Sequence, residues 1–190
     1  YDDADATNIG LGMDLADPGG MTRLVNNKMI VYFNGSHADL RKQIRQGIAR
    51  TLVDNRLFGE NIGETVGNAT LLDLPTWLTD GYVAYAAEGW TIEKDNELKN
   101  ALLANEYRNF YSLAFDHPTL AGQAFFHYLA KRYKKENVTY FMYLSILYKN
   151  TNNASLRICR KKLKDVLKEM MEQESEKYYA DIRGRRNYPK

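Results

Sequence analysis

Histidine and cysteine often bind metals or act as nucleophiles in proteins, and this chain of 190 residues has few of them. Its three histidines are His37, His117 and His127, and its only cysteine is Cys159. No two histidines have the spacing of a helical pair of metal ligands. Since His127 stands among aromatic residues, we interpret it as a hydrogen-bonded core residue. Cys159 is interpreted as a small buried helix residue, and one cysteine cannot form an internal disulfide.

The chain is organised around a stretch that runs from Asp39 to Glu88. Its first part, residues 39–54, predicts a helix in which Gln46 and Arg50 stand four residues apart on one face. Two histidines at this spacing bind zinc together. An amide, however, is a poor zinc ligand, and a guanidinium has five donors, no acceptor and a permanent positive charge. These two side chains are therefore unsuited to holding a divalent cation.

The layout of this stretch resembles that of the gluzincin zinc peptidases, most closely the peptidase MA-like proteins of bacterial envelopes. In that family a strand leads into a helix with the motif His-Glu-x-x-His, and a later Pro-x-Trp-Leu-x-Glu-Gly segment supplies a third ligand. The corresponding segments read Gln46-Gly-Ile-Ala-Arg50 and Leu74-Pro-Thr-Trp-Leu-Thr-Asp-Gly-Tyr-Val-Ala-Tyr-Ala-Ala-Glu88. Residues 27–36 resemble the family's strand, and residues 122–133 resemble a later helix. The resemblance therefore covers nearly the whole chain.

The resemblance places Gln46, Gly47 and Arg50 at the positions of the first His, the catalytic Glu and the second His. Asp80 stands at the position of the ligand Glu. A catalytic zinc needs about three protein ligands and an open position for water. Gly47 has no side chain that could activate this water. The resemblance thus implies a degenerate site with no catalytic residue, no bound metal and no other cofactor.

Two further expectations follow from the resemblance. Arg50 and Asp80 are expected to form an ion pair in the space that a zinc ion would bridge. Trp77, Tyr82 and Tyr85 are the candidate lining of the former cleft, although for Trp77 we favour a core position.

The resemblance leaves two classes of function open. The first is a catalytically inactive peptidase-like domain that binds or scaffolds a protein or peptide partner, or a glycan, in a periplasmic or cell-surface protein. The second is a hydrolase or metallopeptidase with a relocated or non-standard site. Relatives of this kind are often followed by a WD40-like β-propeller. We therefore expect a single domain over residues 1–190 that belongs to a longer protein, with a linker-like tail over residues 183–190.

The elements that would position these residues come in a simple order, strands first and helices afterwards. We expect strands at residues 8–13, 21–25 and 28–33, with a tight hairpin at Asn26-Asn27. The glycine-rich residues 58–72 predict a loop. Helices are expected at residues 39–54, 74–88, 93–103, 120–133 and 138–148, and then as a short helix and a last helix after Asn153. The order predicts a helix-rich α+β fold, with a small sheet on the first helix and a helical C-terminal lobe. The resemblance implies that this fold is zincin-like.

One face of the first helix carries the residues that we expect to point into the core. They are Leu40, Ile44, Gly47, Ile48, Thr51 and Leu52.

Charge and hydropathy exclude some partners. The formal net charge is +2, with 26 basic and 24 acidic residues, so we expect no strong attraction to nucleic acid. No apolar run is long enough for a transmembrane helix. A basic cluster at residues 157–168 is followed by glutamates, a pattern typical of a solvated helix with ion pairs along its surface.

Overall fold

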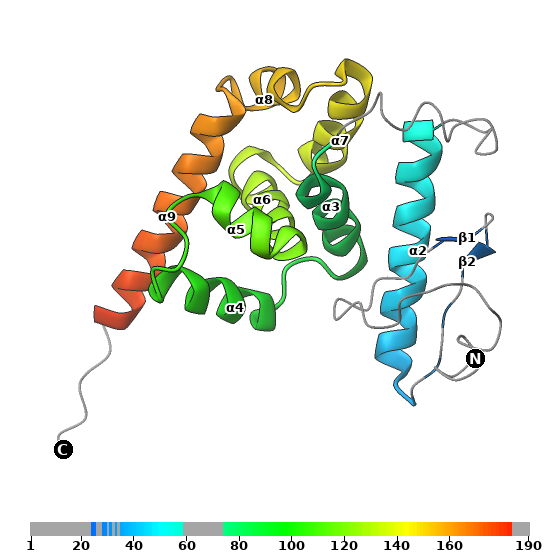
Figure 1. Cartoon of the computed structure of the whole chain (residues 1–190), viewed down its shortest axis with the longest axis horizontal. Coiled ribbons are helices and arrows are strands. Elements are labelled where there is room, and N and C mark those ends of the chain that lie inside the picture. The colour runs from blue at the N-terminus through cyan, green and yellow to red at the C-terminus, as the bar shows by residue number, and fades with distance from the viewer. Residues whose placement is uncertain are drawn as a thin grey trace. The chain divides into compact units, whose positions relative to one another are not determined.

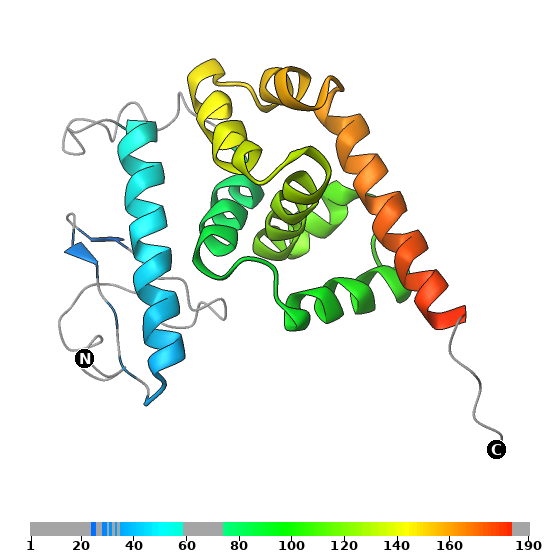
Figure 2. The same cartoon turned by 180° about the vertical axis from the view of Figure 1, so that it is seen from behind.

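The computed structural model describes residues 24–25, 28–29, 31, 33, 35–58 and 74–183, and most of these are helical. Their eight helices are labelled in Figure 1 and seen from behind in Figure 2. In chain order they are α2 (His37–Phe58), α3 (Thr76–Glu88), α4 (Ile92–Leu103), α5 (Phe110–Asp116), α6 (Pro118–Tyr133), α7 (Glu136–Tyr148), α8 (Thr151–Cys159) and α9 (Leu163–Arg183). Within these described residues, no helix has both the length and the apolar character needed to cross a membrane.

The expected α+β class is wrong for the part of the chain that the structure describes. The strands found there are only two residues long, β1 (Leu24–Val25) and β2 (Lys28–Met29), and they pair antiparallel with Leu24 opposite Met29. This pairing agrees with the predicted hairpin, but so few residues cannot form a layer with a buried face. Phe33, expected in a strand, lies against His37 with ring centroids 5.1 Å apart. The expected strand at residues 8–13 lies outside the described residues.

Contacts divide the chain into two compact units. One comprises Tyr1–Leu71 with Ala86–Glu88, and the other comprises Leu72–Tyr85 with Gly89–Lys190. The second unit contains α4 to α9 and most of α3. The predicted helical C-terminal lobe corresponds to this second unit.

Helix α2 begins where the sequence predicts but buries a different face. Ser36 caps it, since the Asp39 N–H donates to Ser36 Oγ at 3.2 Å. The expected apolar stripe is wrong at three positions, because Ile44, Ile48 and Leu52 are 36%, 53% and 61% exposed. The buried face is instead made of Gln43, Gln46, Gly47, Ala49 and Val53. Periodicity finds an apolar stripe but cannot tell which face the rest of the fold covers.

Helix α6 is the centre of the second unit. It packs against α5, α7, α9 and α4, and residues Leu120 to Phe126 are all buried. The apolar side chains of the surrounding helices complete this core, among them Leu113 on α5, Phe141 on α7 and Val166 on α9, each fully buried. In Figure 1, α9 runs along one side of the unit from α8 to α4, consistent with its contacts to both.

Two glycines allow α3 and α6 to cross in backbone contact. A Cβ added to Gly81 would lie 2.3 Å from Gly122 Cα, and one added to Gly122 would lie 1.8 Å from the Trp77 carbonyl oxygen. No side chain fits between the two helices at this point. The crossing therefore fixes the position of Trp77 and its neighbours on α3 relative to the central helix.

Candidate functional site

The positions that the resemblance assigns to the first zinc ligand and the catalytic base lie on the buried face of α2. Gln46 is only 2% exposed, and its Oε1 has no hydrogen-bond partner among the residues that the structure describes. Gly47 is buried as well, and its carbonyl accepts a 2.8 Å bond from Thr51 Oγ1. Arg50 is half-buried. A buried amide, a glycine and a guanidinium together offer a divalent cation one weak ligand and one positive charge.

Asp80, at the position of the third ligand, lies half-buried on α3. Arg50 and Asp80 belong to different units of the chain. The ion pair expected between them therefore stays a prediction.

The three candidate cleft residues lie on α3 in the second unit. Trp77 is 6% exposed, with its ring centroid 4.9 Å from that of Phe110 and 5.5 Å from that of Phe125, both edge to face. It belongs to the packing between helices, as the sequence favoured. Tyr82 and Tyr85 are half-buried, and Tyr82 Oη donates to Thr139 Oγ1 on α7 at 3.4 Å. A cleft lined by these two tyrosines also stays a prediction.

His127 is partly buried and held neutral by its surroundings. Its ring stacks on Trp90, with centroids 5.1 Å apart and planes inclined by 15°. Burial, together with the nearby charges of Lys131 and Lys177, lowers the pKa of His127 to about 4. This environment is that of a packed aromatic residue, close to the sequence interpretation, although the bond partner expected for the ring is replaced by stacking.

Asp95 joins α4 to α9 and was not singled out by sequence. Its Oδ1 accepts bonds from Tyr178 Oη at 2.9 Å, Lys177 Nζ at 2.9 Å and Trp90 Nε1 at 3.1 Å. Burial alone would raise the pKa of Asp95, but these donors outweigh it and lower the pKa below its usual range. The partners Lys177 and Tyr178 stand more than eighty residues away in sequence. No local pattern could have revealed the network.

The cysteine and the other two histidines lie at or next to the ends of helices. Cys159 is buried near the end of α8, and burial raises its pKa to about 11, so the thiol stays protonated at neutral pH. His117 is exposed between α5 and α6, and His37 is exposed at the start of α2. Across the residues that the structure describes, no three His, Cys, Asp or Glu side chains come together in a way that could hold a metal ion.

The chain was compared with models of protein families, with curated proteins and with solved structures, and none of the three comparisons gave a match.

Proposed function

We propose that this chain is a catalytically inactive, zinc-peptidase-like domain that acts as a binding or scaffolding module. The main support is the chemistry of Gln46, Gly47 and Arg50 on α2, which stand where the resemblance requires two metal ligands and a general base. Gln46 and Arg50 are unsuited to binding zinc, and Gly47 has no side chain that could act as a general base. A location in the periplasm or at the cell surface is part of the proposal and rests on the resemblance alone.

The rigid core of the second unit supports a scaffolding role. Helices α3 and α6 meet in backbone contact, and the Asp95 network fastens α4 to α9. Such packing holds the backbone to which surface side chains are attached, which lowers the entropy lost when a partner binds.

Metal analysis and a hydrolysis assay test the proposal directly. The purified chain is dialysed against zinc, its metal content is measured by mass spectrometry, and it is incubated with casein with and without a chelator. We expect less than stoichiometric zinc and no hydrolysis that the chelator abolishes. Stoichiometric zinc together with chelator-sensitive cleavage would refute the proposal and would favour a hydrolase with a relocated site.

A further inference from the structure

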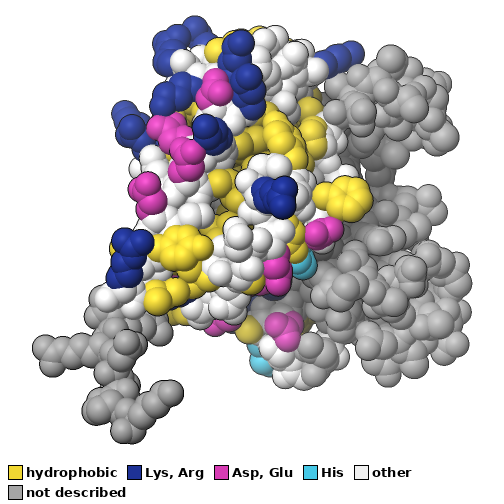
Figure 3. Space-filling model, turned by 60° about the vertical axis from the view of Figure 1, so that its left-hand side comes forward, with side chains coloured by type: hydrophobic (Ala, Val, Ile, Leu, Met, Phe, Trp, Pro, Cys, Tyr) yellow, Lys and Arg dark blue, Asp and Glu magenta, His cyan; other side chains and the backbone are white. Residues whose placement is uncertain are grey.

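The corner where α8 ends and α9 begins carries an open groove of about 780 Å³. Nine residues line it, five of them basic and three acidic, and the ninth is Leu156. Figure 3 shows Lys and Arg side chains gathered toward the start of α9, with Asp and Glu side chains between them. The five basic residues belong to the basic cluster of the sequence, and the turn from α8 to α9 places them around this groove.

Two of the basic residues are already paired with glutamates of α9. Lys161 Nζ bonds to both carboxylate oxygens of Glu169, at 2.9 and 2.8 Å. Lys168 Nζ lies 3.7 Å from Glu172 Oε1, and both side chains are more than half exposed. These pairs reduce the charge that Lys161 and Lys168 can offer to a ligand.

The other three basic residues of the groove carry charge that is available to a ligand. Arg160, Lys162 and Lys164 are exposed, and no ion pair involves them within the residues that the structure describes. Arg160 ends α8 in the left-handed conformation with φ 59°, whereas Lys162 and Lys164 flank the buried Leu163 at the start of α9. The anchored Leu163 thus leaves its two lysine neighbours on the outside of the corner.

Two hydrogen bonds hold the backbone of this corner. Ser155 Oγ donates to the Lys161 carbonyl at 2.9 Å, and the Leu163 N–H donates to Asn152 Oδ1 at 3.0 Å. Ser155 is fully buried, so its bond is shielded from water. The three cations therefore extend from a backbone that is already ordered before any ligand arrives.

Leu156 adds an apolar surface to the groove. It is 41% exposed and is the one aliphatic side chain of the lining. We propose that the groove binds an acidic segment of a protein, whose carboxylates pair with Arg160, Lys162 and Lys164 while an apolar side chain covers Leu156. The inference does not depend on the peptidase resemblance, because it concerns other elements than the α2 and α3 positions.

The acidic residues of the groove favour a protein segment over a nucleic acid or an anionic membrane. Asp165, Glu169 and Glu172 lie between the cations. A phosphate backbone or a lipid surface presents dense negative charge, and its attraction grows with the number of cations it meets. The three carboxylates reduce the formal charge of the five cations from +5 to +2, which weakens that attraction. A peptide can place single carboxylates against the three cations and keep clear of the carboxylates.

Fluorescence anisotropy of the full chain with a labelled peptide tests the proposal. The probe repeats two glutamates and one leucine, and the control probe replaces leucine with serine. We expect the leucine peptide to bind more tightly. The variant Arg160→Glu, Lys162→Glu, Lys164→Glu should weaken binding at least about tenfold, since each exposed ion pair contributes up to about 1 kcal/mol.

A matched variant makes the same change in charge elsewhere. Arg108, Lys135 and Lys149 are exposed and line no part of the groove, so Arg108→Glu, Lys135→Glu, Lys149→Glu should change the affinity less than about threefold. A neutral variant, Arg160→Asn, Lys162→Gln, Lys164→Gln, keeps the test valid if charge reversal disturbs folding, because Asn tolerates a positive φ. Circular dichroism compares the folding of the variants.

Three results would overturn the proposal. The two charge-reversal variants could lose affinity equally, which would indicate a general effect of net charge. The leucine and serine peptides could bind equally. Finally, phosphatidylserine vesicles or single-stranded RNA could bind the chain more tightly than the leucine peptide, with the groove variant abolishing that binding, and the partner would then be a polyanion.

Discussion

At the scale of single residues, the contact between Gly81 and Gly122 gives the second unit its tightest constraint. At an uncrowded helical position, Gly→Ala stabilises a protein by up to about 1 kcal/mol. At Gly122 the added Cβ would stand 1.8 Å from the Trp77 carbonyl oxygen, a backbone atom that can move only with its helix. Gly122→Ala should therefore destabilise the chain, whereas the same substitution at an uncrowded position would stabilise it.

We predict that Gly122→Ala lowers the free energy of unfolding by about 3 kcal/mol, within the range of overpacked cores. Urea unfolding followed by circular dichroism measures it. The control Ala86→Gly, at an exposed position of α3, should cost about 1 kcal/mol through helix propensity alone. A stabilising effect of Gly122→Ala would show that α3 and α6 do not touch there.

Another residue-scale prediction concerns pH. The pKa of His127 is about 4 in the folded chain and about 6.5 in an unfolded one. Between about pH 6.5 and pH 4, His127 therefore binds a proton in the unfolded chain but stays neutral in the folded chain. The free energy of unfolding is therefore not reduced by His127 above about pH 6.5, and it decreases as the pH falls toward 4.

The variant His127→Phe keeps an aromatic ring against Trp90 and removes the titration. Between about pH 7 and pH 5, the wild type should lose up to about 1 kcal/mol more stability than the variant, allowing for solvent screening of a partly buried group. Unfolding midpoints in urea at the two pH values measure the difference. Equal losses in the two proteins would mean that His127 titrates normally in the folded state.

At the scale of elements, α4 and α9 are held together by polar contacts as well as by packing. Asp95 receives three hydrogen bonds, and Lys99 pairs with Asp181 along the same two helices. Tyr178 is only 1% exposed, so its hydroxyl depends on Asp95 as an acceptor. A buried donor left without an acceptor costs about 1–3 kcal/mol.

We predict that Asp95→Ala destabilises the chain by about 2 to 3 kcal/mol, measured by thermal unfolding. Glu93→Ala is the matched control, because Glu93 has the same charge and lies in the same first turn of α4 but is exposed. It should have a clearly smaller effect than Asp95→Ala, because Glu93 is exposed and its carboxylate interacts mainly with the helix dipole. Should the two variants have equal effects, the bonds to α9 contribute nothing measurable.

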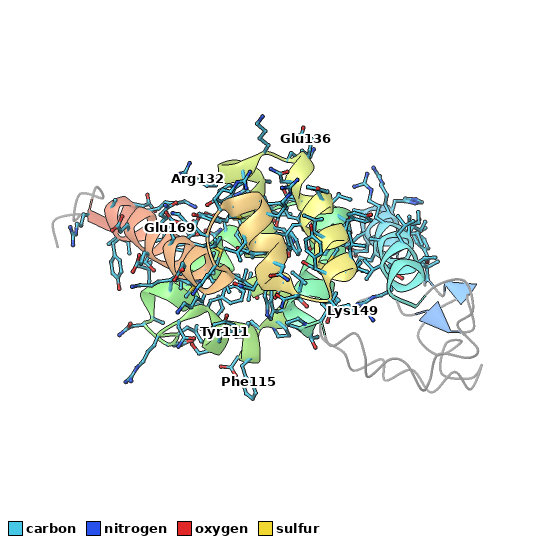
Figure 4. All side chains as sticks on the ribbon, turned by 90° about the horizontal axis from the view of Figure 1, so that it is seen from above. Tyr111, Phe115, Arg132, Glu136, Lys149 and Glu169 are labelled. Atoms are coloured by element: carbon cyan, nitrogen blue, oxygen red, sulfur yellow. The ribbon has the colours of Figure 1, made fainter. Side chains whose placement is uncertain are left out.

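Helix α5 packs on the core with one face and exposes aromatic side chains on the other. On the short helix α5, Phe110 is buried, while Tyr111 and Phe115 are 55% and 87% exposed. Figure 4 shows Tyr111 and Phe115 on one side of the second unit, with Arg132 and Glu136 on the opposite side. The aromatic residues of α5 therefore divide between core and surface.

At the scale of the whole molecule, the proposed loss of the metal site can be reversed by design. The variant Gln46→His, Gly47→Glu, Arg50→His, Asp80→Glu restores the residue types of the resembled family. We predict that it binds zinc and that its melting temperature rises when zinc is added. Gln46→His alone should bind none tightly, because one ligand cannot hold the ion.

Calorimetric titration with zinc compares the two variants. Failure of the fourfold variant, despite a wild-type circular dichroism spectrum, would show that α2 and α3 are not arranged as in the zinc peptidases. The resemblance, and with it the proposed function, would then lose its basis.

The sequence was sufficient to predict most helices of the second unit, although it did not predict the short helix α5. The expected ranges 74–88, 93–103, 120–133 and 138–148 correspond to α3, α4, α6 and α7, with ends within two residues. Local signals mark two of these helix starts: Thr91 caps α4 by accepting a bond from Lys94 N–H, and α6 begins at Pro118, a residue common in the first turn. The unsuitability of Gln46, Gly47 and Arg50 as zinc ligands is likewise a property of residue type.

Which surfaces come into contact depends on the tertiary structure. On α2 the polar Gln46 is buried and the hydrophobic Ile48 is exposed, the reverse of what their hydrophobicity alone would predict. Asp95 bonds to Tyr178, and Gly122 lies against Trp77, although the partners are far apart in sequence. The free energy of such contacts comes from desolvation and from the exclusion of atoms by other parts of the chain. A local pattern contains neither quantity, so these contacts, and the reduction of the strands among the described residues to two short segments, could not be predicted from the sequence alone.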